Sequence, residues 1–128
     1  MFNKSIAIVV YDLDLLNLFS EALKMSGYHN ISSFTDPLVA YQHIQENPNK
    51  YSLLIIDDKM PAMNGLFLST KLLEINPKLN VILLSNHFDD NLKYNYKFNI
   101  LKKRVSIYKL IDVVNDSISK SISHGDKL

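Results

Sequence analysis

Four short runs of apolar residues and one mixed segment, Ile-Ser-Ser-Phe, divide the chain, and longer stretches with a helical spacing of apolar residues separate them. The apolar runs lie at residues 6–10, 53–56, 81–84 and 100–101, and the mixed segment, which we also expect to be a short strand, lies at 31–34. Continuous apolar runs of this length predict strands that are buried on both faces, as in parallel sheets. The run at 53–56 leads directly into Asp57 and Asp58, then into a loop that contains Pro61 and Gly65. We expect this run to form the central strand.

The stretches between these runs carry signals for the starts and ends of helices. Asp14 is the predicted N-cap of the first helix, and Gly27 is placed to end that helix in a left-handed conformation. Asp36 followed by Pro37 predicts the start of the second helix, with proline at its first position. Three further helices are expected at residues 66–75, at the weakly periodic segment 88–98, and from the N-cap Ser106 onward.

Five strands that alternate with five helices predict a parallel sheet covered by helices on both faces. Because crossover connections are right-handed, few topologies remain. We expect an α/β protein with a flavodoxin-like, doubly wound five-stranded parallel sheet of strand order 2-1-3-4-5, in three layers. Residues 1–121 form one domain in this interpretation, and a polar C-terminal tail, 122–128, follows it, with fraying expected from residue 119.

The composition excludes several functional classes. The formal net charge of +1 points neither to nucleic acid nor to an acidic substrate. The chain has no cysteine, which excludes disulfides, thiol nucleophiles and cysteine-based zinc sites. The first apolar run has only five residues, too few for the apolar region of a signal peptide or for a membrane span. We therefore expect a soluble, cytoplasmic protein that binds neither membranes nor nucleic acid directly.

Four polar residues follow the predicted strands at the same edge of the sheet: Asp12, Asp57, Ser85 and Lys103. In open α/β sheets this carboxyl edge is where ligands bind. Two carboxylates and a backbone carbonyl suit Mg²⁺, which takes few protein oxygens and keeps several waters. Asp57 can attack phosphorus and form an aspartyl phosphate, while a serine hydroxyl and a lysine ammonium can contact the phosphoryl oxygens. Asp58 points to the opposite side of the strand and is interpreted as a turn or surface acid.

The chain resembles the receiver domain of two-component response regulators over about residues 5–119. Residues 55–65 read Ile-Ile-Asp-Asp-Lys-Met-Pro-Ala-Met-Asn-Gly, close to the family's strand-Asp-x-x-Met-Pro-x-Met-x-Gly signature, and the segments 81–85 and 101–103 also fit. The resemblance implies a signalling module rather than a turnover enzyme. In it, Asp57 accepts a phosphoryl group from a histidine kinase or a phosphotransfer protein during a phosphorelay.

The same resemblance implies roles for the neighbouring residues. Asp12 and the backbone carbonyl of Lys59 would help Asp57 to hold Mg²⁺, and Ser85 and Lys103 would contact the phosphoryl oxygens. It also implies a surface for a homodimer or an acidic partner, formed by the segment 88–98, the last strand and the last helix.

Three positions depart from the family pattern. Tyr11 stands where receivers carry the first of two adjacent acids, which predicts weakened Mg²⁺ binding. Arg104 replaces the proline that normally follows the lysine, and Ile100 occupies the position of the aromatic switch residue. Because Lys102 adjoins Lys103, the assignment of the functional lysine can shift by one residue.

Two alternatives remain open at this point. The first is an atypical receiver that signals with little or no phosphorylation. The second is a phosphatase of the haloacid dehalogenase type that uses Asp12 and Asp14, since these residues form an Asp-x-Asp pattern after a strand. Against the phosphatase, Leu16 occupies the position of an expected Thr or Val, and no acidic pair on a later strand follows the lysines.

Overall fold

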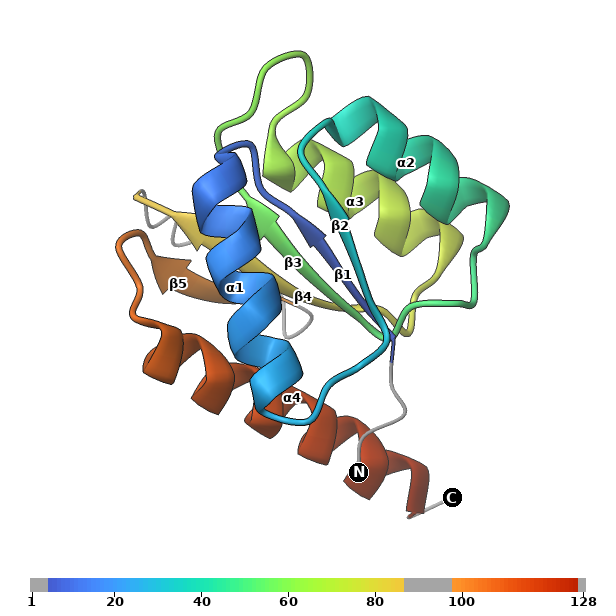
Figure 1. Ribbon diagram of the computed structural model, residues 1–128. Helices are drawn as coiled ribbons and strands as arrows, with labels where there is room; N and C mark the ends of the chain where they lie inside the picture. Colours follow the sequence, from blue (N-terminus) through green and yellow to red (C-terminus); the bar gives the residue numbers. More distant parts are fainter. Residues whose placement is uncertain (1–4, 87–97, 127–128) are drawn as a thin grey trace.

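The sheet has the predicted architecture. The computed structural model describes residues 5–86 and 98–126, with side chains up to residue 119. Five parallel strands form one sheet of order β2-β1-β3-β4-β5 (Figure 1). The strands are β1 (Ile6–Val9), β2 (Ile31–Phe34), β3 (Leu53–Asp57), β4 (Asn80–Ser85) and β5 (Phe98–Lys102). The doubly wound order predicted from the sequence is therefore confirmed.

Four helices lie within the described residues, and they cover both faces of the sheet (Figure 1). They are α1 (Leu13–Met25), α2 (Pro37–Glu46), α3 (Gly65–Ile75) and α4 (Ile107–Asp126). The fifth helix expected at 88–98 falls on residues 87–97, outside the described part of the chain, and stays a prediction. Its last residue, Phe98, belongs to β5.

Alternating residues of the strands build two separate cores. On one face, Ile8 and Ile55 pack with side chains of α1 and α4. On the other face, Val9 and Ile56 pack with side chains of α2 and α3. All residues of β1 and β3 are buried. Burial on both faces explains why these strands read as continuous apolar runs rather than as alternating patterns.

The start of α1 differs from the prediction. Asp12, not Asp14, is the N-cap: its Oδ1 atom accepts hydrogen bonds from the backbone N–H groups of Asp14 (2.9 Å) and Leu15 (3.2 Å). Asp12 has extended backbone angles, which a cap residue requires, whereas Asp14 already lies in the first helical turn. There its carboxylate faces the positive end of the helix dipole.

The other helix signals behave as predicted. The side chain of Asp36 caps α2, and Pro37 is its first residue. Gly27 follows α1 with a φ of +103°. Ser106 caps α4 by accepting a hydrogen bond from the Lys109 backbone N–H.

The last helix is longer than predicted. It continues to Asp126, beyond residue 119 where fraying was expected. The serine-rich sequence there contains no proline to stop a helix, so polarity alone was a poor indicator of its end. Among the described residues, no helix has the length and apolar character needed to cross a membrane.

Candidate functional site at the carboxyl edge of the sheet

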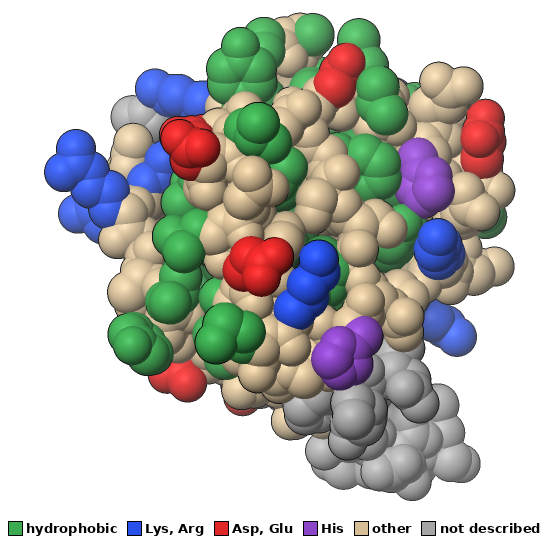
Figure 2. Space-filling view, in the orientation of Figure 1, with side chains coloured by type: hydrophobic (Ala, Val, Ile, Leu, Met, Phe, Trp, Pro, Cys, Tyr) green, Lys and Arg blue, Asp and Glu red, His purple; other side chains and the backbone are tan. Residues whose placement is uncertain are grey.

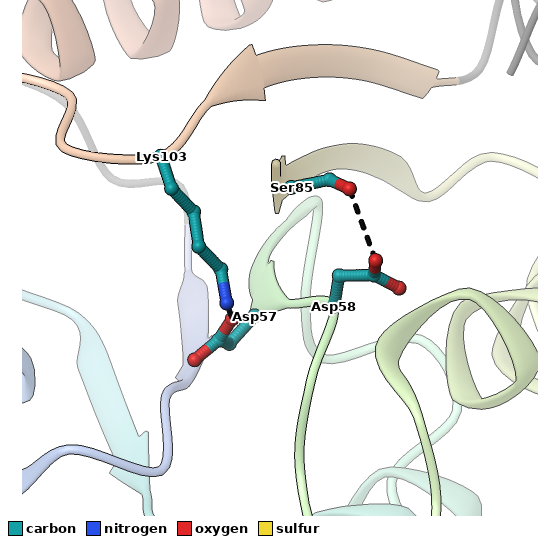
Figure 3. A network of polar contacts seen from close by, with 4 residues as sticks. All are labelled: Asp57, Asp58, Ser85 and Lys103. Atoms are coloured by element: carbon teal, nitrogen blue, oxygen red, sulfur yellow. Dashed lines mark hydrogen bonds and ion pairs between the residues drawn. The ribbon is translucent and has the colours of Figure 1, made fainter. Parts of the chain in front are cut away.

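Asp57 is the last residue of β3 and only 8% exposed. The Lys103 ammonium lies 2.6 Å from the Asp57 Oδ1 atom (Figure 3). Within the described structure this buried oxygen receives no other contact from a donor group. Because burying a carboxylate without a partner is costly, the contact with Lys103 offsets part of the cost of burying Asp57.

The sheet register places Lys103 beside Asp57. Ser85 pairs with Lys102 in the parallel ladder, and the Lys103 backbone N–H donates to the Ser85 carbonyl at 3.1 Å. Asp57, on β3, pairs with Leu84, which precedes Ser85 on β4. Lys102 is exposed and makes no contact with Asp57. Of the two adjacent lysines, Lys103 is thus the one that lies next to Asp57.

A cavity of about 340 Å³ opens over this pair. It is lined by Asp12, Leu15, Phe19, Asp57, Leu84, Asn86, Lys103, Arg104 and Val105. Three of the four predicted strand-end residues, Asp12, Asp57 and Lys103, are therefore brought together. Leu15, Phe19 and Val105 give the cavity an apolar wall, which strengthens electrostatic interactions within it.

Ser85 does not share this arrangement. The residue is 2% exposed, and its hydroxyl donates to the Oδ2 atom of Asp58 at 3.0 Å. Figure 3 shows that Ser85 and Asp58 lie on the side of β3 away from Lys103. The expected convergence of Ser85 on Asp57 is thus absent in this conformation. Asp58, interpreted from the sequence as a turn or surface acid, is half-buried and has a specific partner.

The loop after Asp57 is held against the end of β3. The Gly65 backbone N–H donates to the Asp58 carbonyl at 2.7 Å. A Cβ atom on Gly65 would lie 2.2 Å from the backbone oxygen of Asp57, so only glycine fits. Ala62 has a φ of +72° in the same loop. The motif ends in glycine because any larger residue at position 65 would clash with the backbone of Asp57.

The residues at this edge suit a magnesium ion with few protein ligands. Asp12 and Asp57 supply carboxylate oxygens to one cavity, whereas Lys59, in the adjoining loop, is not among the residues that line it. One Asp12 oxygen is already used in capping α1. Among the described residues, no cluster of three His, Cys, Asp or Glu side chains could hold a metal. The donor set fits Mg²⁺, which uses hard oxygen ligands and keeps several waters.

Of the three residues that depart from the family pattern, one lines the cavity over Asp57 and two do not. Tyr11 is 58% exposed and lines a separate hollow of about 290 Å³, together with Asp36, Pro61 and other residues of neighbouring loops. It therefore contributes no side chain to the cavity over Asp57. Ile100 is half-buried in β5. Arg104 lines the cavity and has a φ of +65°, a feature that the sequence did not indicate.

A family model described as the response regulator receiver domain matches residues 6–115. The chain belongs to this family. Receiver domains of this kind are typical of phosphorelay signalling in two-component systems. The membership argues against the haloacid dehalogenase alternative, and the structure agrees, since Asp14 lies in the first turn of α1 and is absent from the cavity.

Named relatives support the same assignment. The receiver domain is 34% identical over 82 residues to the response regulator receiver protein CpdR of Brucella abortus (strain 2308), a match covering 64% of this chain and 66% of that protein. It is 31% identical over 85 residues to the C4-dicarboxylate transport transcriptional regulatory protein DctD of Rhizobium meliloti (strain 1021). That match covers 66% of this chain and 18% of DctD. The chain thus spans about two thirds of the first relative and a small part of the second.

Solved structures show the same fold. A response regulator receiver domain protein from Clostridium thermocellum superposes with a TM-score of 0.80 at 24% identity, covering 91% of this chain and 95% of that one. The CheX–CheY–BeF₃–Mg²⁺ complex from Borrelia burgdorferi gives 0.79 at 17% identity, covering 90% and 89%. At these identities the similarity establishes the fold alone.

Proposed function

We propose that Asp57 is the phosphoacceptor of this receiver domain. The observation that carries the proposal is the buried Asp57 carboxylate, ion-paired to Lys103 at 2.6 Å on the wall of a cavity. A carboxylate oxygen is the nucleophile that attacks phosphorus, and Lys103 places a positive charge next to it. The cavity gives a phosphoryl donor access to it from solvent.

The transfer step is a displacement at phosphorus. An Asp57 oxygen forms a bond to the phosphorus atom of a phosphohistidine or an acyl phosphate. The donor's P–N or P–O bond breaks, and its electron pair leaves with the histidine nitrogen, which takes up a proton, or with the carboxylate of the acyl donor. Lys103 then contacts an oxygen of the transferred group, whose charge has replaced that of the carboxylate.

Other residues of the edge would support this step. Asp12, Asp57 and the Lys59 carbonyl would hold Mg²⁺, which offsets charge on the phosphoryl oxygens when bound. Ser85 would donate its hydroxyl to a phosphoryl oxygen, which requires it to leave Asp58. The domain would act as a signalling module without turnover chemistry of its own.

The proposed partners follow from this role. A histidine kinase or a phosphotransfer protein in the cytoplasm would supply the phosphoryl group. A homodimer or an acidic partner would use the face that includes β5 and α4; residues 87–97, part of the segment predicted to contribute to it, lie outside the described residues. Direct contact with nucleic acid is not expected of this domain, because its formal net charge is only +1.

The test is phosphorylation by a small donor. The protein is incubated with phosphoramidate and Mg²⁺, and its intact mass is measured. Wild type should acquire one phosphoryl group, Asp57→Asn should acquire none, and the matched variant Asp58→Asn should still be modified. A phosphoryl group retained in Asp57→Asn would refute the assignment. Wild type without any adduct would favour an atypical receiver that signals without phosphorylation.

A further inference from the structure

Arg104 is an exposed residue that belongs to the same cavity as the candidate phosphoacceptor. It lines the same cavity as Asp57, Asp12 and Lys103, immediately after the lysine in the chain. In Figure 2, Lys and Arg side chains gather where the chain leaves β5, next to acidic side chains near the start of α1. Two cationic residues, Lys103 and Arg104, therefore line the cavity, whereas the sequence motif accounts for one.

The backbone of Arg104 is held in an unfavourable conformation. Its φ of +65° lies in the left-handed region, where a residue with a side chain is less stable than glycine. The turn into α4 does not need a cation, since Ser106 supplies the helix cap. Strained non-glycine residues cluster at functional sites, so the position of this one at the cavity points to a role there.

The charge balance of the cavity indicates what that role is. Its lining residues include two acids, Asp12 and Asp57, and two cationic residues, Lys103, which is paired with Asp57, and the exposed Arg104. Tyr11, which precedes Asp12, lines a different hollow and adds no acid. Such a cavity attracts a divalent cation less strongly than an acidic one and a phosphoryl dianion more strongly. A guanidinium also presents a planar fork of donors that matches phosphoryl oxygens.

We propose that Arg104 is a second cationic contact to the phosphoryl group at Asp57, and that it takes over part of the charge compensation otherwise left to the metal. This inference rests on the proposed function. It has a consequence that a purely structural role lacks. Removing the charge at Arg104 should weaken the interaction with the anionic donor and, at the same time, strengthen the binding of Mg²⁺.

The experiment compares Arg104→Gln and Arg104→Lys with the control Lys102→Gln. Lys102 is an exposed cation two residues away that does not line the cavity. Two quantities are measured for each variant of the chain. One is the rate of adduct formation at subsaturating phosphoramidate, with Mg²⁺ and with EDTA, followed by intact mass. The other is the Mg²⁺ dissociation constant without donor, followed by tyrosine fluorescence, because the chain has seven tyrosines and no tryptophan.

Arg104→Gln should lower the rate about tenfold, the loss typical of one charge-assisted contact, and the deficit should be larger in EDTA. It should also tighten Mg²⁺ binding about threefold, because a partly screened repulsion is removed. Arg104→Lys should restore most of both values, and Lys102→Gln should stay within about twofold of wild type, since exposed charges off the site are screened.

Two results would overturn the inference while leaving Asp57 as the phosphoacceptor. The first is equal behaviour of Arg104→Gln and Lys102→Gln. The second is a loss of both donor reactivity and Mg²⁺ affinity in Arg104→Gln, which would indicate a structural role. Arg104→Gly separates strain from charge: it should raise stability while reproducing the loss of reactivity. Absence of any adduct in wild type would instead refute the proposed function itself, and with it this inference.

Discussion

Replacing Gly65 with alanine is expected to disturb the phosphoacceptor through its backbone. The new Cβ atom would lie 2.2 Å from the Asp57 oxygen and 2.9 Å from its carbonyl carbon, whereas ordinary contact begins at 3.4 Å. Either the β3 end or the start of α3 must therefore shift by about 1 Å. Overpacking of this kind costs about 1–3 kcal/mol, and loss of the 2.7 Å Gly65–Asp58 hydrogen bond adds about 1 kcal/mol.

We therefore expect Gly65→Ala to lower the free energy of unfolding by about 2–3 kcal/mol. This value is below the sum of the two losses because alanine has a higher helix propensity than glycine. Phosphorylation of Asp57 by phosphoramidate should slow at least about tenfold, because a displaced carboxylate loses its alignment with Lys103. Urea unfolding followed by circular dichroism gives the stability, and intact mass gives the rate.

Gly27→Ala is the matched control. Gly27 has a φ of +103° but nothing within 4 Å of an added Cβ atom, so only local strain arises there. It should lose about 1–2 kcal/mol of stability and keep its reactivity at Asp57. Normal stability and normal phosphorylation in Gly65→Ala would refute the close approach of Gly65 to the Asp57 backbone. Equal loss of reactivity in both variants would show that stability, not site geometry, controls the rate.

Two further predictions concern Asp12 and Tyr28. Asp12→Ala should lose about 1 kcal/mol of stability, because the cap of α1 is removed, and should weaken Mg²⁺ binding by about tenfold or more. The control Asp14→Ala should leave the Mg²⁺ affinity nearly unchanged. Equal Mg²⁺ affinities in the two variants would exclude Asp12 as a ligand. Tyr28→Phe should lose about 1 kcal/mol, because the buried Tyr28 hydroxyl donates to Asn115 on α4. Burial raises the pKa of Tyr28 above its usual 10.0. The stability that the Tyr28 hydroxyl contributes is therefore fully present below pH 10 and is lost as the pH rises through the pKa of Tyr28 in the folded protein. A difference in urea stability between wild type and Tyr28→Phe that grows above pH 10 would contradict this.

The fold could be predicted because the strands are buried on both faces. Burial forces β1 and β3 to be continuously apolar, and their order then follows from right-handed crossovers. The error at α1 arose because Asp12 and Asp14 both precede the apolar stripe of the helix. Only the extended backbone of Asp12 distinguishes cap from first turn, and the sequence does not encode that angle directly.

The site was predictable to the level of strand ends but not of side-chain conformations. The topology brings Asp12, Asp57 and Lys103 to one cavity, as the sequence indicated. The Ser85 hydroxyl can reach Asp57 or Asp58 depending on the side-chain rotamers, and it donates to Asp58. The alternation of residues along a strand does not predict side-chain rotamers. The positive φ of Arg104 was equally hidden, since a left-handed residue is usually signalled by glycine or asparagine.

The bond between Ser85 and Asp58 bears on how phosphorylation would change the domain. Under the proposed function, Ser85 must exchange a carboxylate acceptor for a phosphoryl oxygen on the other side of β3. A hydrogen bond to a charged acceptor contributes about 1.5–3 kcal/mol in either place, so the exchange is nearly balanced. A nearly balanced exchange is what a switch needs, since a modification that adds a few kcal/mol can then move the population from one state to the other. Asp58, which the sequence motif leaves variable, would thereby set how readily this receiver domain changes state.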